Sequence, residues 1–364
     1  MTELIDYLKT YRDRYSFFNL LIPVFFGFFD DEDIFIASQS QSAWSEIGAV
    51  FELENEKDLK EELDYPVAPP QAWPSTTSRP TIGCRELVSR NLLGMMPGLA
   101  RDAVDNLNLD NRIMATRVFA LVISHCERNI HQHVPKVVEV ITRGATDTCE
   151  KVRAHAASIA EWLCILSQPE LVLKILLPGL EGFSLGTLVT LEKFAKTSNS
   201  AELIQQVISS FTRAMTCLTR DDRVIAHIRS TLFHAAKTAN ATSQLDIVSI
   251  ELYCQALMTH QIEFNAKVFQ TLSKKSKFSV PDMLQLSGIH FISLHHDSIK
   301  TWNQHSNEFH AWICLLHFAS SVSYQTIFVV SKSTGFPARM RITLDHYYET
   351  EMKPLFNKCL IWRL

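Results

Sequence analysis

The sequence predicts an all-α fold in which about eight to nine helical hairpins stack into an α-solenoid. Glycine is scarce, at 11 of 364 residues, about 3 % against a typical ~7 %, as expected for a helical chain with few tight turns. Residues able to begin a helix recur every 37 positions, at Asp110, Asp147, Ser184 and Asp221. Each stands between two stretches with helical spacing of apolar residues. Two helices per repeat of this length are typical of a solenoid.

The hairpin around Asp147 illustrates the pattern. The preceding stretch, 134–142, and the following one each place their apolar residues on one helical face: Val134, Val137, Val138 and Ile141, then Val152, Ala156, Ile159, Ala160 and Leu163. Asp147 is expected to be the N-cap of the second helix, with Glu150 as its capping-box partner. The same role is expected for Asp110, Ser184 and Asp221, whose side-chain oxygens can accept the free N–H groups of the following helix.

Further hairpins are expected before and after this one. They pair 15–29 with 34–51, 168–180 with 184–196, 201–218 with 222–239, and 244–259 with 265–273. After residue 279 the pattern weakens, although 281–292 and 306–320 still have helical spacing. Residues 325–330 are β-branched, and we predict a helix there rather than a strand; 324–345 is expected to be an unfinished repeat.

Composition divides the chain into four segments: acidic helical pairs over 1–65, a Pro-rich inserted loop over 66–82, regular repeats over 83–275, and less regular, incomplete repeats over 276–364. Proline lacks a backbone donor and disfavours helix in the residue before it. The loop is expected to be a passive linker rather than a Pro-rich ligand, because no P-x-x-P flanked by basic residues occurs. Trp73 in this loop either packs on the solenoid or is free to bind a partner.

The overall composition argues against several classes of protein. The net charge of −4 and the pI of about 6.4 give no basic field for nucleic acid. The eight cysteines form no C-x-x-C pair, so buried free thiols are expected rather than a zinc module or disulfide scaffold. The first 15 residues do not resemble a signal peptide, and the apolar run 20–29 is too short to span ~30 Å of hydrocarbon. We expect a soluble, cytoplasmic chain without membrane contact.

No pattern of catalytic or cofactor chemistry is present. The sequence lacks G-x-x-x-x-G-K-[ST], G-x-G-x-x-G and G-x-S-x-G. Histidines are dense near the end of the chain but lack an organised metal-ligand spacing: His290, His295, His296, His305, His310 and His317. His131 and His133 precede a helix and are expected to be exposed. We therefore predict no catalytic, cofactor or metal residues, no small-molecule substrate, and no enzyme activity.

Charge is unevenly distributed along the chain. Residues 1–66 hold 15 Asp and Glu against 5 Lys and Arg, a net charge of −10, whereas the rest holds 24 against 30, a net charge of +6. This acidity either provides solubility and helix capping by Asp33, or forms a docking edge for a basic partner segment. The candidate partner-binding residues are Glu52, Glu54, Glu56, Glu61 and Glu62.

Several motifs resemble the HEAT repeat. They include Asp147 followed by Val152-Arg153, and Asp110-x-Arg112-Ile113 with Ala115. A longer stretch resembles the axonemal dynein assembly factor 5 family of HEAT-repeat proteins: Trp44-x-x-Ile47-Gly48, Asp58-Leu59-Lys60, Arg79-Pro80, Gly83-Cys84-Arg85-Glu86-Leu87-Val88-x-Arg90-Asn91-Leu92, and Pro97-x-Leu99-Ala100 with Asp102. The resemblance specifies the fold as a HEAT/armadillo-type solenoid.

This resemblance also implies a function. Family members are cytoplasmic factors that pre-assemble axonemal dynein arms for motile cilia or flagella, so a non-enzymatic scaffold that binds dynein chains and assembly co-factors or chaperones is expected. Because members of the family are longer, the chain is expected to be a fragment or truncated form. A general HEAT-repeat adaptor, of the phosphatase-scaffold or transport-receptor type, is the alternative.

Overall fold

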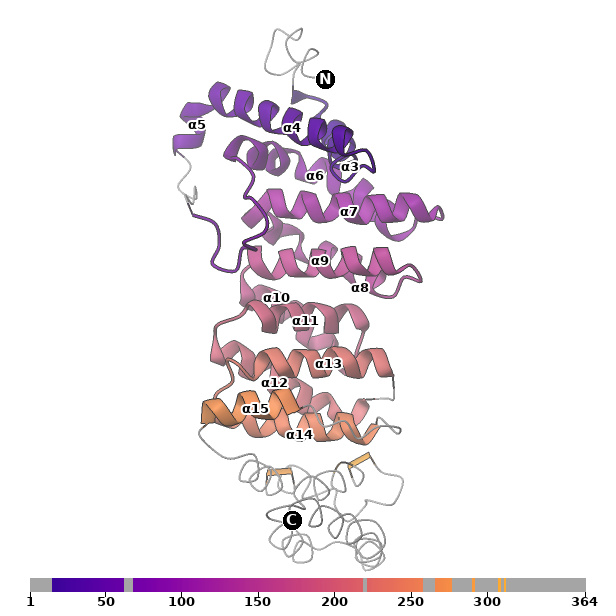
Figure 1. The fold of residues 1–364 in the computed structure, drawn as a ribbon, viewed down its shortest axis with the longest axis vertical. Coiled ribbons are helices and arrows are strands. Elements are labelled where there is room, and N and C mark those ends of the chain that lie inside the picture. Colours follow the sequence, from indigo (N-terminus) through magenta and orange to yellow (C-terminus); the bar gives the residue numbers. More distant parts are fainter. Residues whose placement is uncertain are drawn as a thin grey trace, which may run out of the picture. The chain divides into compact units, whose positions relative to one another are not determined.

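The computed structural model describes residues 15–61, 68–218, 221–257 and 266–276, with residues 290, 291, 307, 308 and 311. Every regular element in these ranges is an α-helix or a 3₁₀-helix (Figure 1). The chain forms two compact units. The first comprises Met1–Leu176 and Ser184–Thr197, and the second comprises Leu177–Phe183 and Ser198–Leu364. The four compositional segments are not tested by this division and stay a prediction.

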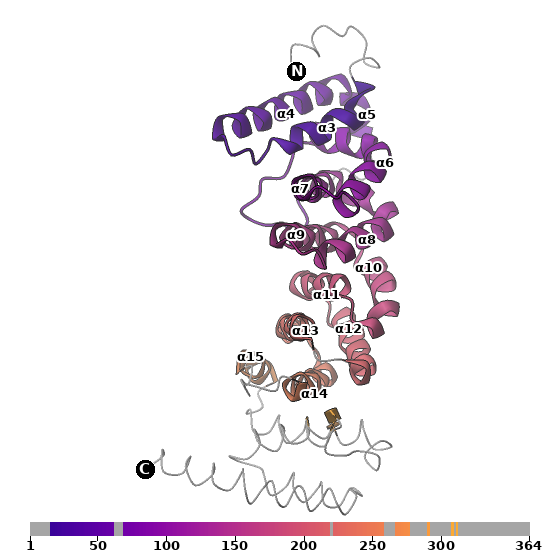
Figure 2. The same cartoon turned by 90° about the vertical axis from the view of Figure 1, so that its right-hand side faces the viewer.

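The first unit is a stack of helical hairpins. Its elements are α3 (Phe18–Gly27), α4 (Ile34–Glu54), α5 (Glu56–Glu61), α6 (Ile82–Val104), α7 (Leu109–Cys126), η1 (Glu127–His133), α8 (Val134–Ala145), α9 (Glu150–Leu166), α10 (Pro169–Leu176) and α11 (Leu185–Thr197). Figure 2 shows α6, α8 and α10 in one layer and α7, α9 and α11 in the other. Helices α6 and α8 contact each other, and α9 contacts both α7 and α11, so neighbouring hairpins pack on one another as in a solenoid.

The core of this unit lies between the two layers. Fully buried apolar side chains recur on successive helices, which is how one-sided helices bury their apolar faces in a stack: Phe26, Val88, Phe119, Ile123, Ile141, Ile159, Leu163, Leu188 and Leu191. Trp44 of α4 is 3 % exposed and belongs to this core.

The second unit continues with the same kind of hairpin. It contains η2 (Leu177–Gly182), α12 (Ala201–Ala214), η3 (Met215–Cys217), α13 (Asp222–Ala235), α14 (Ala241–Leu257) and α15 (Ala266–Ser276). Helix α14 packs against both α12 and α13. Inside this unit Arg229 Nε lies 2.9 Å from Glu251 Oε1, and the Glu251 side chain is fully buried.

The predicted all-α, HEAT/armadillo-type solenoid is confirmed. The described hairpins are α3–α4, α6–α7, α8–α9, α10–α11, α12–α13 and α14–α15, and their limits agree with the expected ranges to within a few residues. The helices predicted at 281–292 and 306–320 lie mostly outside the described residues and stay a prediction. The helix at 325–330 and the segment 324–345 lie wholly outside them.

Of the four helix caps predicted from the 37-residue spacing, two are correct. Ser184 Oγ accepts a hydrogen bond from Thr187 N at 3.2 Å, and Asp221 Oδ1 accepts from Arg223 N at 2.9 Å. The prediction was wrong for Asp110, because Asn108 caps α7 and accepts from Asp110 N at 2.9 Å. Asp110 instead lies in the first turn of that helix.

The predicted cap at Asp147 was also wrong. The N-cap of α9 is Cys149, which makes no side-chain cap bond. Asp147 Oδ1 accepts from Cys149 N at 2.8 Å and so shapes the turn before the helix, while its Oδ2 accepts from Arg112 Nε at 3.0 Å. Because Asp147 lies two residues before the N-cap, only one of its carboxylate oxygens binds the turn. The other can accept the hydrogen bond from Arg112 of α7.

Candidate functional site

The Pro-rich loop is a strap fastened across the first unit. We define the strap as residues 68–81; it passes the level of α9 and leads into the start of α6 (Figures 1 and 2). The Trp73 ring lies 4.8 Å from that of Trp162 on α9, and Trp73 Nε1 donates to Thr77 O at 2.8 Å. Trp73 therefore packs on the solenoid, which decides between the two alternatives left open by the sequence.

A second anchor ties the end of the strap to η1. Arg79 donates to both carboxylate oxygens of Glu127, from Nε to Oε1 and from Nη2 to Oε2, each at 2.8 Å. Arg85 Nη1 donates to Glu127 Oε2 at 3.0 Å. All three side chains are only 11–12 % exposed. A bidentate pair screened from water holds its geometry better than a surface ion pair. The strap is therefore anchored to the stack, while the choice between a linker and a Pro-rich ligand stays a prediction.

The backbone at Glu127 is unusual. Its φ of 44° lies in the left-handed region, which is uncommon for a residue other than glycine. Glu127 is where α7 ends and η1 begins. With this backbone conformation the Glu127 carboxylate faces the strap. Its contacts with Arg79 and Arg85 stabilise this position.

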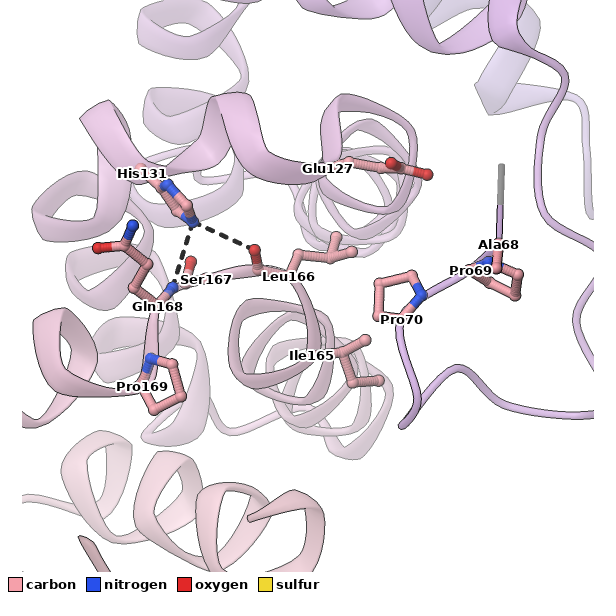
Figure 3. A pocket seen from close by; sticks show the side chains of 10 residues that line it. All are labelled: Ala68, Pro69, Pro70, Glu127, His131, Ile165, Leu166, Ser167, Gln168 and Pro169. Carbon is pink, nitrogen blue, oxygen red and sulfur yellow. Dashed lines mark hydrogen bonds between the residues drawn. The ribbon is translucent and has the colours of Figure 1, made fainter. Parts of the chain in front are cut away.

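Below the strap lies a pocket of about 520 Å³. Figure 3 shows its lining, which comes from the start of the strap, from η1 and from the turn between α9 and α10: Ala68, Pro69, Pro70, Glu127, His131, Ile165, Leu166, Ser167, Gln168 and Pro169. Proline rings and aliphatic side chains form the apolar walls, while Glu127, His131 and Ser167 are the polar groups. Apolar walls with a few polar groups are the usual lining of a binding pocket.

Polar groups at the α9–α10 turn hold its shape. His131 Nε2 lies 3.2 Å from Gln168 N, which donates to it, and 3.2 Å from Leu166 O. His131 is half-buried, and its ring contacts the backbone of the α9–α10 turn. The expectation that it is exposed was therefore wrong. Ser167 is 6 % exposed, and its Oγ has no hydrogen-bond partner in the described part of the chain.

Ser167, His131 and Glu127 do not form a catalytic triad. Such a triad needs a serine bonded to the histidine and a carboxylate bonded to the other ring nitrogen. Here Ser167 Oγ makes no such bond, and the Glu127 carboxylate is held by Arg79 and Arg85. What the pocket offers is apolar walls with a few polar groups at its edge, which are the features of a binding site.

The acidic candidate residues lie elsewhere, near the end of α4 and along α5. Glu54 and Glu56 are exposed, whereas Glu52 is half-buried. Glu54 Oε2 accepts a hydrogen bond from Tyr15 OH at 2.8 Å. Glu61 ends α5, but its side chain and the whole of Glu62 lie outside the described residues. None of the five lines the pocket.

Other groups flagged in the sequence have ordinary surroundings. His290 Nε2 lies 2.8 Å from Asp246 Oδ1, and the remaining histidines of its cluster lie outside the described ranges. Within those ranges no His, Cys, Asp and Glu side chains gather as metal ligands would. Cys84, Cys126 and Cys254 are buried free thiols, whereas Cys217 is exposed. None of the described helices combines the length and apolar character needed to cross a bilayer.

Sequence reasoning missed the partners of the strap and the polar part of the pocket. The Pro-rich composition and Trp73 marked the strap itself. However, Glu127 lies 48 residues from Arg79, and His131 lies 37 residues from Gln168. Only the stacking of hairpins brings these residues together, so no local signal could have found them.

Two family models match the chain. Residues 71–262 match one described as dynein axonemal assembly factor 5, HEAT-repeat domain, and residues 1–62 match one described as dynein axonemal assembly factor 5-like, TPR repeats. The first match alone covers more than half of the 364 residues.

Curated relatives carry the same description. Dynein axonemal assembly factor 5 of Xenopus laevis is 27 % identical over 337 residues, which is 91 % of this chain and 39 % of the relative. The Mus musculus protein of that name is 35 % identical and the Homo sapiens protein 33 % identical over 175 residues, 48 % of this chain and 20 % of each relative. The chain thus spans about two fifths, or less, of these relatives.

Solved structures give more distant matches. A crystal structure of importin beta aligns with a TM-score of 0.32 and 12 % identity, covering 88 % of this chain and 46 % of that one. A designed armadillo repeat protein aligns with a TM-score of 0.27 and 12 % identity, covering 81 % of this chain and 99 % of that one. Similarity at this level carries no functional information.

Proposed function

The chain belongs to the dynein axonemal assembly factor 5 family, and from that premise we propose that it is a protein-binding scaffold that assists the assembly of axonemal dynein. The observation that carries the proposal is the match of residues 71–262 to the HEAT-repeat model of this family. The chain spans two fifths or less of these relatives, so the assembly activity of a whole family member is a proposal for this chain.

The proposed mechanism is surface binding in the cytoplasm, without catalysis. A solenoid buries one stripe of each helix and leaves the rest accessible, so it can hold a client along an extended surface. Dynein chains and assembly co-factors or chaperones are the proposed partners, and motility of cilia or flagella is the proposed purpose. The pocket beneath the strap and the acidic residues Glu52, Glu54 and Glu56 are the proposed contact points.

Geometry at the pocket supports binding over chemistry. Its serine, histidine and carboxylate are not arranged for proton transfer among themselves. Its apolar walls, formed by proline rings and aliphatic side chains, suit a peptide segment that supplies apolar side chains. Binding of this kind can shield client surfaces that are unpaired during assembly.

Affinity capture tests the proposed partners. The tagged chain is expressed in ciliated cells, and co-purifying proteins are quantified against an unrelated tagged solenoid of similar size. We expect axonemal dynein chains to be enriched over the control. Recovery of a phosphatase catalytic subunit or a transport GTPase in their place would support the general adaptor and contradict the proposal.

A genetic experiment tests the purpose. Cells lacking the endogenous family member are expected to lose dynein arms from their axonemes in electron micrographs. The capture experiment reports on partners, whereas this loss reports on assembly. Normal arms in such cells would contradict an assembly role even if dynein chains were captured.

A further inference from the structure

Exposed apolar side chains are concentrated on the first described hairpin. In the described residues, every Val, Leu, Ile, Met or Phe with a largely exposed side chain lies between Phe17 and Met114. The largest group flanks the α3–α4 turn: Phe17, Leu20, Val24, Phe28, Ile34 and Phe35, each 45–83 % exposed. Solvent-exposed apolar groups of this size mark interaction sites on soluble proteins.

The residues on α3 form a regular stripe. Phe17, Leu20, Val24 and Phe28 have the spacing i, i+3, i+7 and i+11, which places them on one face of the helix. The other side of α3 is buried through Phe18, Ile22, Phe25 and Phe26. A helix that is apolar all round is normally covered on every side. The stripe spans the twelve residues from Phe17 to Phe28, or roughly 16 Å between its ends.

The surroundings of the stripe are acidic and contain no basic side chain of the same hairpin. Residues 15–56 include no Lys, Arg or His, and four consecutive acids, Asp30 to Asp33, separate Phe28 from Ile34. Arg117 of α7 reaches this turn but binds the carbonyl oxygens of Gly27 and Asp30. No ion pair to the four carboxylates occurs in the described part of the chain. Asp31 and Asp33 accept backbone N–H groups within the turn, and Asp30 interacts electrostatically with His155 of α9. None of these contacts neutralises the turn, so a net negative charge remains for a partner.

We propose that this surface, the α3 stripe with its acidic turn, binds an amphipathic basic helix of another protein. About three turns of such a helix match the stripe in length, with its apolar residues on the stripe and Lys or Arg beside Asp30 and Glu32. The acidic turn disfavours an anionic membrane surface as the occupant. The inference rests on the proposed function as a protein-binding scaffold and specifies the chemistry of one partner segment.

Titration with defined peptides tests the site. The purified full chain is mixed with a fluorescent 18-residue Leu/Lys amphipathic helix, and binding is followed by fluorescence anisotropy. A Leu/Glu peptide with the same apolar face is the comparison. We expect the Leu/Lys peptide to bind, with an affinity that falls as salt increases, and the Leu/Glu peptide to bind at least about tenfold more weakly.

Variants locate the binding surface. Leu20→Ser is expected to weaken the Leu/Lys peptide about tenfold, because it removes an anchor that complex formation would bury. Its matched control is Leu107→Ser, which removes an exposed leucine from the α6–α7 turn and is expected to change nothing. The double variant Asp30→Asn with Glu32→Gln is expected to make the affinity of the Leu/Lys peptide less dependent on salt. The control double variant Glu139→Gln with Glu170→Gln is expected to leave this dependence unchanged.

Three results would overturn the proposal. Equal binding of the two peptides would contradict the preference for a basic partner. Unchanged peptide binding by the Leu20→Ser variant would show that the α3 stripe is not the binding site. Sedimentation showing a dimer that Leu20→Ser dissociates would make a second copy of this chain the occupant. Because no dynein is present in these experiments, they can fail while the capture of dynein chains succeeds, and the reverse also holds.

Discussion

Gly48 of α4 and Gly83 of α6 face each other where the two helices cross. A Cβ atom built on Gly83 would overlap the carbonyl oxygen of Gly48, and one built on Gly48 would overlap the Cys84 sulfur. Cys84 Sγ lies 3.4 Å from Trp44 O in the same contact. Both glycines belong to the motifs that carry the family resemblance, so this part of the resemblance reflects a steric requirement of the stack.

Gly83→Ala should destabilise the first unit. The added methyl group has no space, so α4 and α6 must separate, and overpacking of this kind costs about 1–3 kcal/mol. Gly98→Ala in the same helix is the matched control, since nothing lies within 4 Å of a Cβ built there. Urea unfolding should show a lower midpoint for Gly83→Ala, and for Gly98→Ala no loss or a small gain. Equal midpoints would contradict the close crossing.

The contact between Arg112 and Asp147 should couple successive hairpins. The two side chains lie 3.0 Å apart and are 18 % and 13 % exposed, so water screens them little. A double-mutant cycle of Arg112→Ala and Asp147→Ala should give a coupling energy of about 1–2 kcal/mol. Arg143 and Asp105, 3.7 Å apart and over 60 % exposed, are the control pair. Their coupling should stay below about 0.5 kcal/mol; similar values for both pairs would contradict the argument.

The limits of the helices could be predicted better than their caps. The spacing of apolar residues predicts the helix ranges, because each helix buries one face. This spacing does not depend on which residue caps the helix. Near α7, however, Asn106, Asn108 and Asp110 can all accept a backbone N–H, and the sequence does not say which one precedes the first helical residue. At α9 the choice depended on Arg112, whose approach from α7 exists only in the stacked structure.

The candidate site was less predictable than the fold. The Pro-rich composition of 66–82 correctly excluded a helix over the strap, because proline cannot donate the bonds that a helix requires. The fastening of the strap depends on Trp162 and Glu127, which meet it only through the stacking order of α7 and α9. No sequence pattern marks Ser167, because its hydroxyl lacks a hydrogen-bond partner only as a result of the turn in which it lies.

His125 should make stability depend on pH. It is buried between Phe26 and Trp44, with Nδ1 2.7 Å from Leu121 O and Nε2 accepting from Trp44 Nε1 at 3.4 Å. Burial is the main reason that its pKa falls from 6.5 to about 4. The unfolded chain therefore binds more protons than the folded one between these pH values. The stability that His125 provides at neutral pH is lost as pH falls through this window, on the order of 3 kcal/mol in total.

The comparison with His125→Gln isolates this effect from the other histidines. Glutamine does not titrate, so the difference in unfolding free energy between the two proteins should shrink as pH decreases from 7 to 4. Urea unfolding followed by circular dichroism at several pH values measures it. A difference that stays constant over this range would show that His125 is protonated as readily in the folded chain as in the unfolded one.

Trp73→Ala should release the strap without unfolding the helices. The substitution removes the ring contact with Trp162, an interaction worth about 0.5–1.5 kcal/mol beyond the buried area. Proteinase K should then cut within residues 68–80 several-fold faster, because cleavage follows the fraction of open strap. Trp73→Phe retains a ring and should be cut more slowly than Trp73→Ala. Cleavage at the rate of the unmodified chain would mean that Arg79 and Glu127 alone hold the strap.

Neutralising the acidic residues at the end of α4 and along and just after α5 should slow binding of a basic partner. The test changes Glu52, Glu54, Glu56, Glu61 and Glu62 to Gln together. Electrostatic attraction mainly raises the association rate and is screened over ~8 Å at physiological salt. The association rate with a captured partner should therefore fall, by about tenfold at low salt, and its dependence on salt should flatten. Helix content should not change, since glutamine at position 54 can still accept the bond from Tyr15 OH.

A charge-matched control decides whether position or total charge matters. It changes five carboxylates on other elements to amides: Asp102, Asp110, Glu139, Glu170 and Glu181. Both variants lose the same net charge, but only the first loses it at the end of α4 and along α5. If the association rate falls equally in the two, the effect comes from overall charge and the docking edge lies elsewhere. If the rate and its salt slope are unchanged in the first variant, these glutamates serve only to solvate the surface.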